Sequence, residues 1–415
     1  MNIFRAGWCR AYQLGFRTAL PVLPYRTPEE LDSVFEIPIR LRQLGIGSVL
    51  LVTDKQLRSL GLTASLEKEL GNDGITCQVY DSTRSNPTVA NVEEALRLYE
   101  AGNCGAIIGF GGGSAMDCAK AVGARVAWPR RSVQDLGGIL RIWKKIPPLF
   151  AVPTTAGTGS ETTLAAVIVD EKTRHKFTMN DFPLIPRYAV LDAYITVKLP
   201  PFYTATTGID ALTHAVEAYI GQTTTKETRA YSIEAVQLIM KYLERAYQNG
   251  EDIEARQAML RASYLAGMAF TKSYVGYCHA VAHSLGGMYD IPHGLANSVL
   301  LPYVLRSYGK RVYKPLKELA VAAKLARAES IPPVAAELFI RKIERMNKNM
   351  GIPDKLSGIR AEDIKLLAFR ADLEGNPLYP VPKLMDAEEL QQFYVMVADD
   401  LSGAKKKEEA THAGS

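Results

Sequence analysis

Residues 206–221 read TTGIDALTHAVEAYIG and residues 278–302 read CHAVAHSLGGMYDIPHGLANSVLLP, and these two stretches decide how the chain is organised. Asp210 and His214 are four residues apart, a spacing that places a carboxylate and an imidazole on one face of a helix. His279 and His283 repeat that spacing, and His293 follows in a Pro-His-Gly turn. The pattern predicts a group of acidic and imidazole side chains carried on helices.

This group has the composition of a metal site. The chain has 6 histidines in all, and three of them fall between residues 279 and 293. Three neutral imidazoles and one carboxylate suit a borderline divalent cation such as Zn²⁺ or Fe²⁺, whereas Mg²⁺ and Ca²⁺ prefer oxygen ligands. Four protein ligands on a five- or six-coordinate ion leave a position open, which favours catalysis. The alternative is a set of hydrogen-bonded core histidines, and spacing alone does not choose between His279 and His283 as a ligand.

Upstream of these stretches the chain has the periodicity of a parallel α/β domain. A helical stretch from Pro28 to Gly45 is followed by apolar runs, such as SVLLVTD and LFAVP, that alternate with amphipathic stretches such as NVEEALRLYEAG. This alternation predicts a parallel sheet flanked by helices, and VIVDEKTRHKFTM predicts a strand pair. After Pro200 and Pro201 every segment has helical period. We therefore expect an α/β domain over residues 28–200 and an all-helical domain over residues 201–403.

The two ends of the chain differ from both domains. Residues 1–27 contain Arg5, Arg10 and Arg17 but no acidic residue, and they predict a basic amphipathic helix. Such a helix either docks on its own domain or a sister subunit, or lies on a membrane surface. The arginines interrupt each apolar run, so this is no signal peptide, and nowhere is an apolar run long enough for a transmembrane helix. Residues 404–415, AKKKEEATHAGS, predict a disordered tail.

Composition excludes some classes of partner. The chain has 415 residues and a formal net charge of +5, and no basic run is interleaved with aromatic residues, so nucleic-acid binding is not indicated. Its 5 cysteines show no CxxC spacing. An odd number of such cysteines predicts free thiols and a reducing cytoplasm.

A glycine-rich loop follows the predicted strand AIIGF. Gly111, Gly112, Gly113 and Ser114 open a helix that carries Asp117. Glycine lets backbone N–H groups approach a diphosphate closely, and a helix N-terminus favours its negative charge. The loop fits neither GxGxxG nor the P-loop pattern, so a strand-to-helix turn without a ligand is the alternative.

A second loop, PTTAGTGSE, adds the hydroxyl groups of Thr154, Thr155 and Thr158. Successive strand-to-helix loops meet at the carboxyl end of a parallel sheet, where ligands of open α/β folds bind. Asp54 ends a strand at a place where its carboxylate would accept hydrogen bonds from an adenosine ribose and repel a 2′-phosphate, which favours NAD over NADP. The alternative for Asp54 is to cap the following helix.

Taken in order, GGGSAMDCAK, PTTAGTGSE, GIDALTHAVEAY and HAVAHSLGGMYDIPHGLANSVLLP resemble the iron-containing (group III) alcohol dehydrogenase family, over residues 45–401. The resemblance implies a dehydroquinate synthase-like architecture: an α/β NAD-binding domain, an all-α metal-binding domain and an active site in the cleft between them. The family's metal ligands fall on Asp210, His214, His279 and His293, which leaves His283 facing the nicotinamide and the substrate. Its NAD contacts fall on Asp54, Asn86, Gly112, Gly113, Ser114, Asp117, Thr154, Thr155, Thr158 and Lys176.

The resemblance also implies an activity. It implies reversible hydride transfer between NAD and small primary alcohols or diols, with Fe²⁺ or alternatively Zn²⁺, in a homodimer or higher homo-oligomer. His283 would then relay a proton to solvent, because imidazole titrates near neutral pH. The alternatives are a zinc-dependent glycerol or polyol dehydrogenase or a lyase on the same fold, and a non-catalytic assembly or nucleotide-sensing protein. The chain departs from the family at residues 1–26 and in ADLEGNPLYPVPKLMDAEELQQFY, which keeps only the NP pair and the final helix.

Overall fold

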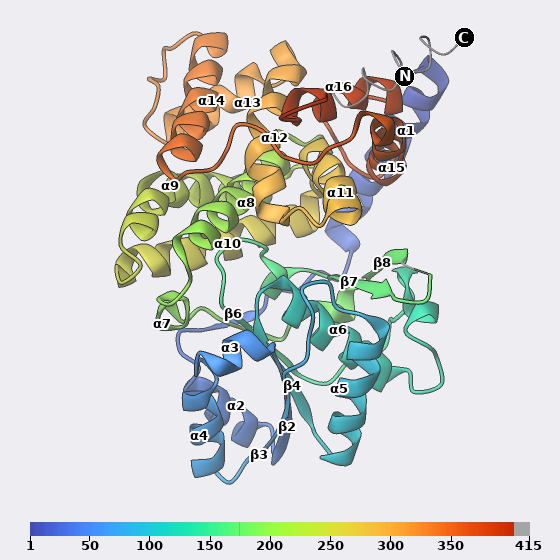
Figure 1. Cartoon of the computed structure of the whole chain (residues 1–415), viewed down its shortest axis with the longest axis vertical. Coiled ribbons are helices and arrows are strands. Elements are labelled where there is room, and N and C mark those ends of the chain that lie inside the picture. The colour runs from blue at the N-terminus through green and yellow to red at the C-terminus, as the bar shows by residue number, and fades with distance from the viewer. Residues whose placement is uncertain (174, 402–415) are drawn as a thin grey trace, which may run out of the picture. The chain divides into compact units, whose positions relative to one another are not determined.

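The structure, a computed structural model, describes residues 1–173 and 175–401, and it divides into two compact units (Figure 1). The α/β unit comprises residues 24–199 and 250–271, and the helical unit comprises residues 1–23, 200–249 and the residues from 272 onward. The predicted disordered tail, 404–415, lies outside the described residues.

The α/β unit is built on a parallel six-stranded sheet with the order β1-β9-β6-β4-β2-β3. Its strands are β1 (Glu29–Leu31), β2 (Ser48–Val52), β3 (Thr76–Tyr80), β4 (Ala106–Gly111), β6 (Leu149–Pro153) and β9 (Tyr188–Val190). Successive side chains of a strand point to opposite faces, so Val49 and Leu51 join one apolar cluster while Leu50 and Val52 join the other. Strands β2, β4 and β6 are buried on both faces, which is why they are continuous apolar runs, whereas the edge strands β1 and β3 are more exposed.

Helices cover both faces of this sheet (Figure 1). The helices between residues 24 and 199 are α2 (Glu36–Gln43), α3 (Lys55–Ser59), α4 (Ala64–Asn72), α5 (Val89–Ala101), α6 (Gly113–Ala127) and α7 (Ala193–Thr196), and all except α3 contribute buried residues to the apolar clusters. Helix α5 begins at a capping box, in which the N–H of Asn91 donates to the hydroxyl of Thr88 and the N–H of Thr88 donates to the side chain of Asn91. The predicted helix from Pro28 to Gly45 is partly wrong. Residues 29–31 form β1, which pairs with β9 and is too short to show a strand period of its own.

A smaller sheet with the order β5-β8-β7 completes the α/β unit. Its strands are β5 (Gly138–Ile139), β7 (Ala165–Asp170) and β8 (His175–Asn180). Strands β7 and β8 are antiparallel, so the predicted strand pair is confirmed.

Residues 250–271 group with the α/β unit and not with the helical unit. They include most of α10 (Ile253–Ser273), which the sequence analysis assigned to the helical domain. A Cβ atom on Gly267 would lie 2.9 Å from the carbonyl oxygen of Gly159. Glycine at both positions therefore lets this helix approach the loop PTTAGTGSE closely. Helical period alone carries no information about which unit a helix joins.

The helical unit confirms the predicted all-α domain. Its helices are α1 (Ile3–Ala19), α8 (Pro201–Ile220), α9 (Lys226–Gln248), α11 (Tyr277–Tyr289), α12 (His293–Tyr308), α13 (Tyr313–Ala322), α14 (Pro332–Asn349), α15 (Ile364–Gly375) and α16 (Ala387–Val397). Short 3₁₀ turns lie in the two units at η1 (Leu20–Val22), η2 (Gln134–Leu136), η3 (Ser160–Thr162), η4 (Phe182–Leu184), η5 (Gly309–Arg311) and η6 (Ala361–Asp363). Apart from one bridge between Leu356 and Ala398, the described residues of this unit form no strand.

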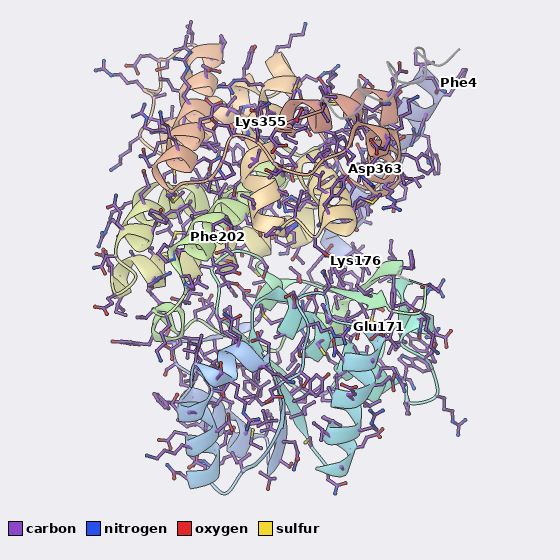
Figure 2. All side chains as sticks on the ribbon, in the orientation of Figure 1. Phe4, Glu171, Lys176, Phe202, Lys355 and Asp363 are labelled. Carbon is purple, nitrogen blue, oxygen red and sulfur yellow. The ribbon has the colours of Figure 1, made fainter. Side chains whose placement is uncertain are left out.

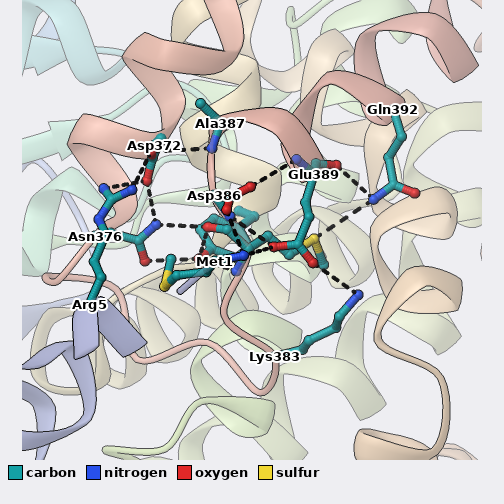
Figure 3. A network of polar contacts seen from close by, with 11 residues as sticks. Met1, Arg5, Asp372, Asn376, Lys383, Asp386, Ala387, Glu389 and Gln392 are labelled. Atoms are coloured by element: carbon teal, nitrogen blue, oxygen red, sulfur yellow. Dashed lines mark hydrogen bonds and ion pairs between the residues drawn. The ribbon is translucent and has the colours of Figure 1, made fainter. Parts of the chain in front are cut away.

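The predicted N-terminal helix is confirmed as α1, and one of its faces docks on its own unit. Arg5 pairs with Asp372 of α15, and the N-terminal ammonium group contacts Asp386 at the start of α16 (Figure 3). The opposite face carries Phe4, which is 88% exposed (Figure 2). In the described part of the chain, no helix combines the length and apolar character needed to cross a membrane.

Candidate functional site

The helical unit brings together the four residues expected to bind a metal. Asp210 and His214 lie one turn apart on α8, His279 lies in the first turn of α11, and His293 is the first residue of α12. One ligand atom from each residue lies within 4.8 Å of all the others. A Cβ atom on Gly294 would lie 2.7 Å from the carbonyl oxygen of Thr206. Glycine after His293 therefore lets α12 begin directly against α8.

The chemistry of this cluster fits a borderline divalent cation. Nε2 of His279 is buried and has no hydrogen-bond partner among the described atoms. Burial, together with the neighbouring imidazoles of His214 and His293, holds the pKa of His279 well below its usual range. Burial also raises the pKa of Asp210, which is 1% exposed, against the effect of His214. A buried carboxylate among neutral imidazoles is costly without a cation, and Zn²⁺ or Fe²⁺ suits that donor set.

Glu217 supports the cluster and was missed by the sequence analysis. Its carboxylate, 3% exposed, lies 2.6 Å from Nδ1 of His279 and accepts hydrogen bonds from the backbone N–H groups of Gly276 and Cys278. With Nδ1 occupied, the Nε2 atom of His279 is the one presented to the cluster. Burial raises the pKa of Glu217 to about 7. The sequence does contain a signal for Glu217, because a residue seven positions after Asp210 lies on the same face of a helix.

Asn297 was also missed. Its side-chain nitrogen lies 2.7 Å from the carboxylate of Asp210 and 3.1 Å from Nε2 of His293. It follows His293 by one turn of α12, so the i, i+4 spacing could have found it. Asn297 is fully buried and links the carboxylate on α8 to the imidazole on α12.

His283 lies beside the cluster and is not part of it. Its ring stacks on His293 with the centroids 5.0 Å apart, and its Nδ1 lies 2.5 Å from Oε1 of Glu374. The structure thus groups His279, and not His283, with the other three residues, which is the choice that spacing left open. Although burial alone would raise it, the pKa of Glu374 lies below its usual range because of His283 and the hydroxyl of Tyr379.

The glycine-rich loop lies between β4 and α6 in the α/β unit. Gly111 has a φ of +156°, and a Cβ atom there would lie 2.6 Å from the Cβ of Ala115. A Cβ atom on Gly113 would lie 3.2 Å from Cγ2 of Thr158, so the two loops approach each other closely. Thr155 Oγ1 is buried and has no partner among the described atoms. Backbone N–H groups at the start of a fifteen-residue helix, with the hydroxyl of Thr155 beside them, suit the binding of a diphosphate.

Asp117 and Lys120 hold the two loops together. The carboxylate of Asp117 accepts hydrogen bonds from Ser160 Oγ at 3.1 Å and from the N–H of Val167 at 3.1 Å. Lys120 is fully buried, and its ammonium group donates to Ser160, to both oxygens of Thr163 and to the carbonyl of Ala165. The structure gives Asp117 internal partners, which shape the loop that we expect to bind the nucleotide.

The remaining predicted nucleotide residues lie in the same unit. Asp54 caps α3 by accepting a hydrogen bond from the N–H of Leu57 at 2.9 Å, which is the alternative role that the sequence analysis left open. Lys176 of β8 donates to Asn86 at 3.2 Å, and Ser114 donates to the carbonyl of Ser85. The N–H of Thr154 donates to the carbonyl of Gly111 at 3.0 Å, joining the ends of β4 and β6.

Comparison with known proteins agrees with this arrangement. A family model described as "Iron-containing alcohol dehydrogenase" matches residues 27–193, and one described as "Fe-containing alcohol dehydrogenase family, C-terminal" matches residues 204–397. The NAD-dependent methanol dehydrogenase of Bacillus methanolicus is 39% identical over 343 residues, which cover 82% of this chain and 89% of that protein. The 1,3-propanediol dehydrogenase of Citrobacter freundii is 36% identical over 385 residues, covering 91% and 98%.

Among solved structures, a 1,3-propanediol oxidoreductase superposes with a TM-score of 0.86 and 34% identity, covering 90% of this chain and 99% of that one. The likeness extends through both units, since the two family matches include the glycine-rich loop in the first and the Asp-His-His-His cluster in the second. On these matches, and on the residues that they contain, the chain belongs to the iron-containing alcohol dehydrogenase family.

Proposed function

We propose that this chain is an NAD-dependent, divalent-metal alcohol dehydrogenase that interconverts small primary alcohols or diols and the corresponding aldehydes. The observation that carries the proposal is the cluster of Asp210, His214, His279 and His293, in which Nε2 of His279 is buried and has no hydrogen-bond partner among the described residues. Two relatives are named as dehydrogenases of methanol and of 1,3-propanediol, so we propose a short alcohol or diol as the substrate of this chain.

These four residues would hold the ion, with Fe²⁺ favoured by the family and Zn²⁺ as the alternative that the same donors accept. When bound, the ion supplies Lewis-acid chemistry that lowers the pKa of an alcohol. The protein's own contribution is to fix the donors in place. Glu217 orients His279 through Nδ1, and Asn297 orients Asp210, so little movement is needed when the ion binds.

NAD would be held by the residues of the α/β unit, and the specificity for NAD would lie in Asp54. The backbone N–H groups of the glycine-rich loop at the N-terminus of α6 would bind the diphosphate, and the carboxylate of Asp54 would disfavour a 2′-phosphate. The residues proposed for this site are Asp54, Asn86, Gly112, Gly113, Ser114, Asp117, Thr154, Thr155, Thr158 and Lys176.

His283 would relay the proton of the alcohol to solvent. Its side chain is 39% exposed, and Nδ1 is engaged by Glu374, which leaves Nε2 as the atom that accepts the proton. Replacing His283 by alanine should lower turnover and leave the metal content unchanged. A His283→Ala variant that loses its metal would make His283 a ligand and refute the relay.

The proposed reaction is tested by purifying the protein without oxygen, measuring its metal, and following NADH absorbance with a panel of short alcohols and diols. Net NADH formation that requires Fe²⁺ or Zn²⁺, with NAD preferred over NADP, supports the proposal and identifies the substrate. Bound metal and bound NAD without turnover on any alcohol or aldehyde would instead favour a lyase or a non-catalytic protein.

We further propose a cytoplasmic homodimer or higher homo-oligomer. The compartment is supported by the five cysteines, all of which are free thiols in the structure. The assembly is supported by family membership, and light scattering of the purified protein tests it directly. A monomer at micromolar concentration would refute that part of the proposal.

A further inference from the structure

Helix α1 precedes the first family match, which begins at residue 27, and it packs on the connection between α15 and α16 of its own unit. At its start, the ammonium group of Met1 lies 2.5 Å from Asp386 and 3.0 Å from Glu389. Arg5 forms two hydrogen bonds of 2.7 Å with the carboxylate of Asp372 (Figure 3). These contacts fix the start of α1 to the last turns of α15 and the first turn of α16.

The middle of α1 holds the connection itself. Gln13 is a buried polar residue, 3% exposed, and its amide nitrogen donates to the carbonyl oxygens of Pro377 at 3.1 Å and Tyr379 at 2.8 Å. The amide oxygen of Gln13 accepts a hydrogen bond from Arg10, which also donates to the carbonyl of Val381 at 2.8 Å. The connection has neither helix nor strand here, and side chains of α1 donate hydrogen bonds to its carbonyl oxygens. The carbonyl of Tyr379 also accepts from the N–H of Val381 at 2.9 Å, so Gln13 adds a second donor to it.

Tyr379, whose carbonyl contacts Gln13, is linked to His283 by the carboxylate of Glu374. Its hydroxyl donates to Oε1 of Glu374 at 2.6 Å, and the same oxygen lies 2.5 Å from Nδ1 of His283. The ring of Tyr379 lies beside Tyr274, whose ring contacts Phe16 of α1 edge-on with the centroids 4.9 Å apart. Helix α1 therefore restrains Tyr379 at its backbone through Gln13 and at its ring through Tyr274.

We propose that Glu374 is the positioning residue for His283, and that α1 holds Glu374 in place through Gln13 and Tyr379. A glutamate side chain loses up to about 2 kcal/mol of rotamer entropy when it is fixed, so an exposed carboxylate would hold the imidazole only part of the time. The Tyr379 hydroxyl removes much of that freedom. Residues 1–26, which lie outside the family matches, thereby become part of the support of the site.

The competing explanation is an incidental ion pair. Glu374 and His283 have side chains 33% and 39% exposed, and pairs with that exposure generally contribute little to stability. If the pair were incidental, a substitution in the distant helix α1 would leave the Nδ1 proton of His283 unchanged. Loss of Glu374 would then also leave the turnover number unchanged. The proposal predicts effects on both. The effect on the Nδ1 proton rests on the contact geometry, and the effect on turnover rests on the relay role proposed above for His283.

The first readout does not depend on turnover. The full-length protein, loaded with diamagnetic Zn²⁺ and labelled with ¹⁵N-histidine, should show a low-field Nδ1 proton that is assigned by its absence in His283→Ala. We expect this signal to be lost in Glu374→Leu, kept in Glu374→Gln, and weakened in Gln13→Ala. Phe4→Ala is the matched control on the exposed face of the same helix and should leave the signal unchanged. A signal that survives Glu374→Leu overturns the proposal, and one unchanged by Gln13→Ala overturns the role of α1.

The second readout is kinetic. In Glu374→Leu, kcat for alcohol oxidation should fall about tenfold, with KM for alcohol and NAD within about twofold of wild type and full metal content. Glu374→Gln should restore most of kcat, and Glu374→Leu should have no further effect in a His283→Ala background. If the losses of kcat caused by Glu374→Leu and His283→Ala multiply in the double variant, the proposal is overturned. If the wild-type protein oxidises no alcohol, the proposed function fails, and the Nδ1 signal still decides the positioning role.

Discussion

Replacing Glu217 by alanine removes the acceptor on which three buried donors depend. The carboxylate accepts from the N–H of Gly276 at 2.8 Å and from the N–H of Cys278 at 2.9 Å, and it lies 2.6 Å from Nδ1 of His279. All three donors belong to the start of α11 and the residue before it. Loss of the carboxylate should therefore disturb both the beginning of that helix and the orientation of His279.

The magnitude follows from what each partner loses. A buried donor without an acceptor costs about 1–3 kcal/mol, so three donors would lower the free energy of unfolding by at least about 3 kcal/mol. Relief of the cost of burying Glu217 itself offsets part of this, and we expect a net loss of about 2–4 kcal/mol. Loss of a partner that orients a ligand typically reduces metal affinity about 10–100-fold. Glu217→Gln keeps one oxygen and should show a smaller loss of each.

The assay pairs two measurements on Glu217→Ala, Glu217→Gln and wild type. Urea denaturation of the metal-free protein gives the free energy of unfolding, and competition with a chelator for Zn²⁺ gives the metal affinity. Glu388→Ala, at an exposed helical glutamate, is the control and should change neither by more than a few tenths of a kcal/mol. A Glu217→Ala protein that is destabilised and still binds Zn²⁺ with wild-type affinity would refute the claim that Glu217 orients His279.

Three further outcomes follow from the structure. Zn²⁺ at about 100 times its Kd should raise the free energy of unfolding of wild type by about 2.7 kcal/mol in a thermal or urea titration, and Asp210→Asn should abolish most of that rise. Gly294→Ala should weaken Zn²⁺ binding and destabilise the protein by about 1–3 kcal/mol, because a Cβ atom would lie 2.7 Å from the carbonyl of Thr206; Gly287→Ala, where nothing lies within 4 Å, should not. Burial lowers the pKa of Lys120 to about 8 from its usual 10.5, so between these values the unfolded chain holds a proton that the folded protein has released. Between pH 8 and pH 10, the free energy of unfolding of wild type should therefore rise relative to that of Lys120→Met, by roughly 1 kcal/mol per pH unit in urea denaturation; a constant difference would contradict a buried, neutralised lysine.

Local patterns in the sequence determined most of the fold and the identity of the candidate site. The alternation of apolar runs and amphipathic stretches predicts the parallel sheet, because both faces of such strands must be apolar. The i, i+4 spacing places Asp210 and His214 on one helix face without knowledge of any other helix. The same logic reaches Glu217 and Asn297, which lie on the faces that carry the predicted ligands.

Only the tertiary structure decided the contacts between residues that are far apart in the sequence. Glu217 and His279 are separated by 62 positions, and Glu374 and His283 by 91, so no local period relates them. The choice of His279 over His283 depends on where α11 packs against α8 and α12, and the role of α1 depends on the docking of residue 13 on residues 377 and 379. A sequence period reports which face of a helix is buried, and the packing of helices decides which polar groups meet there.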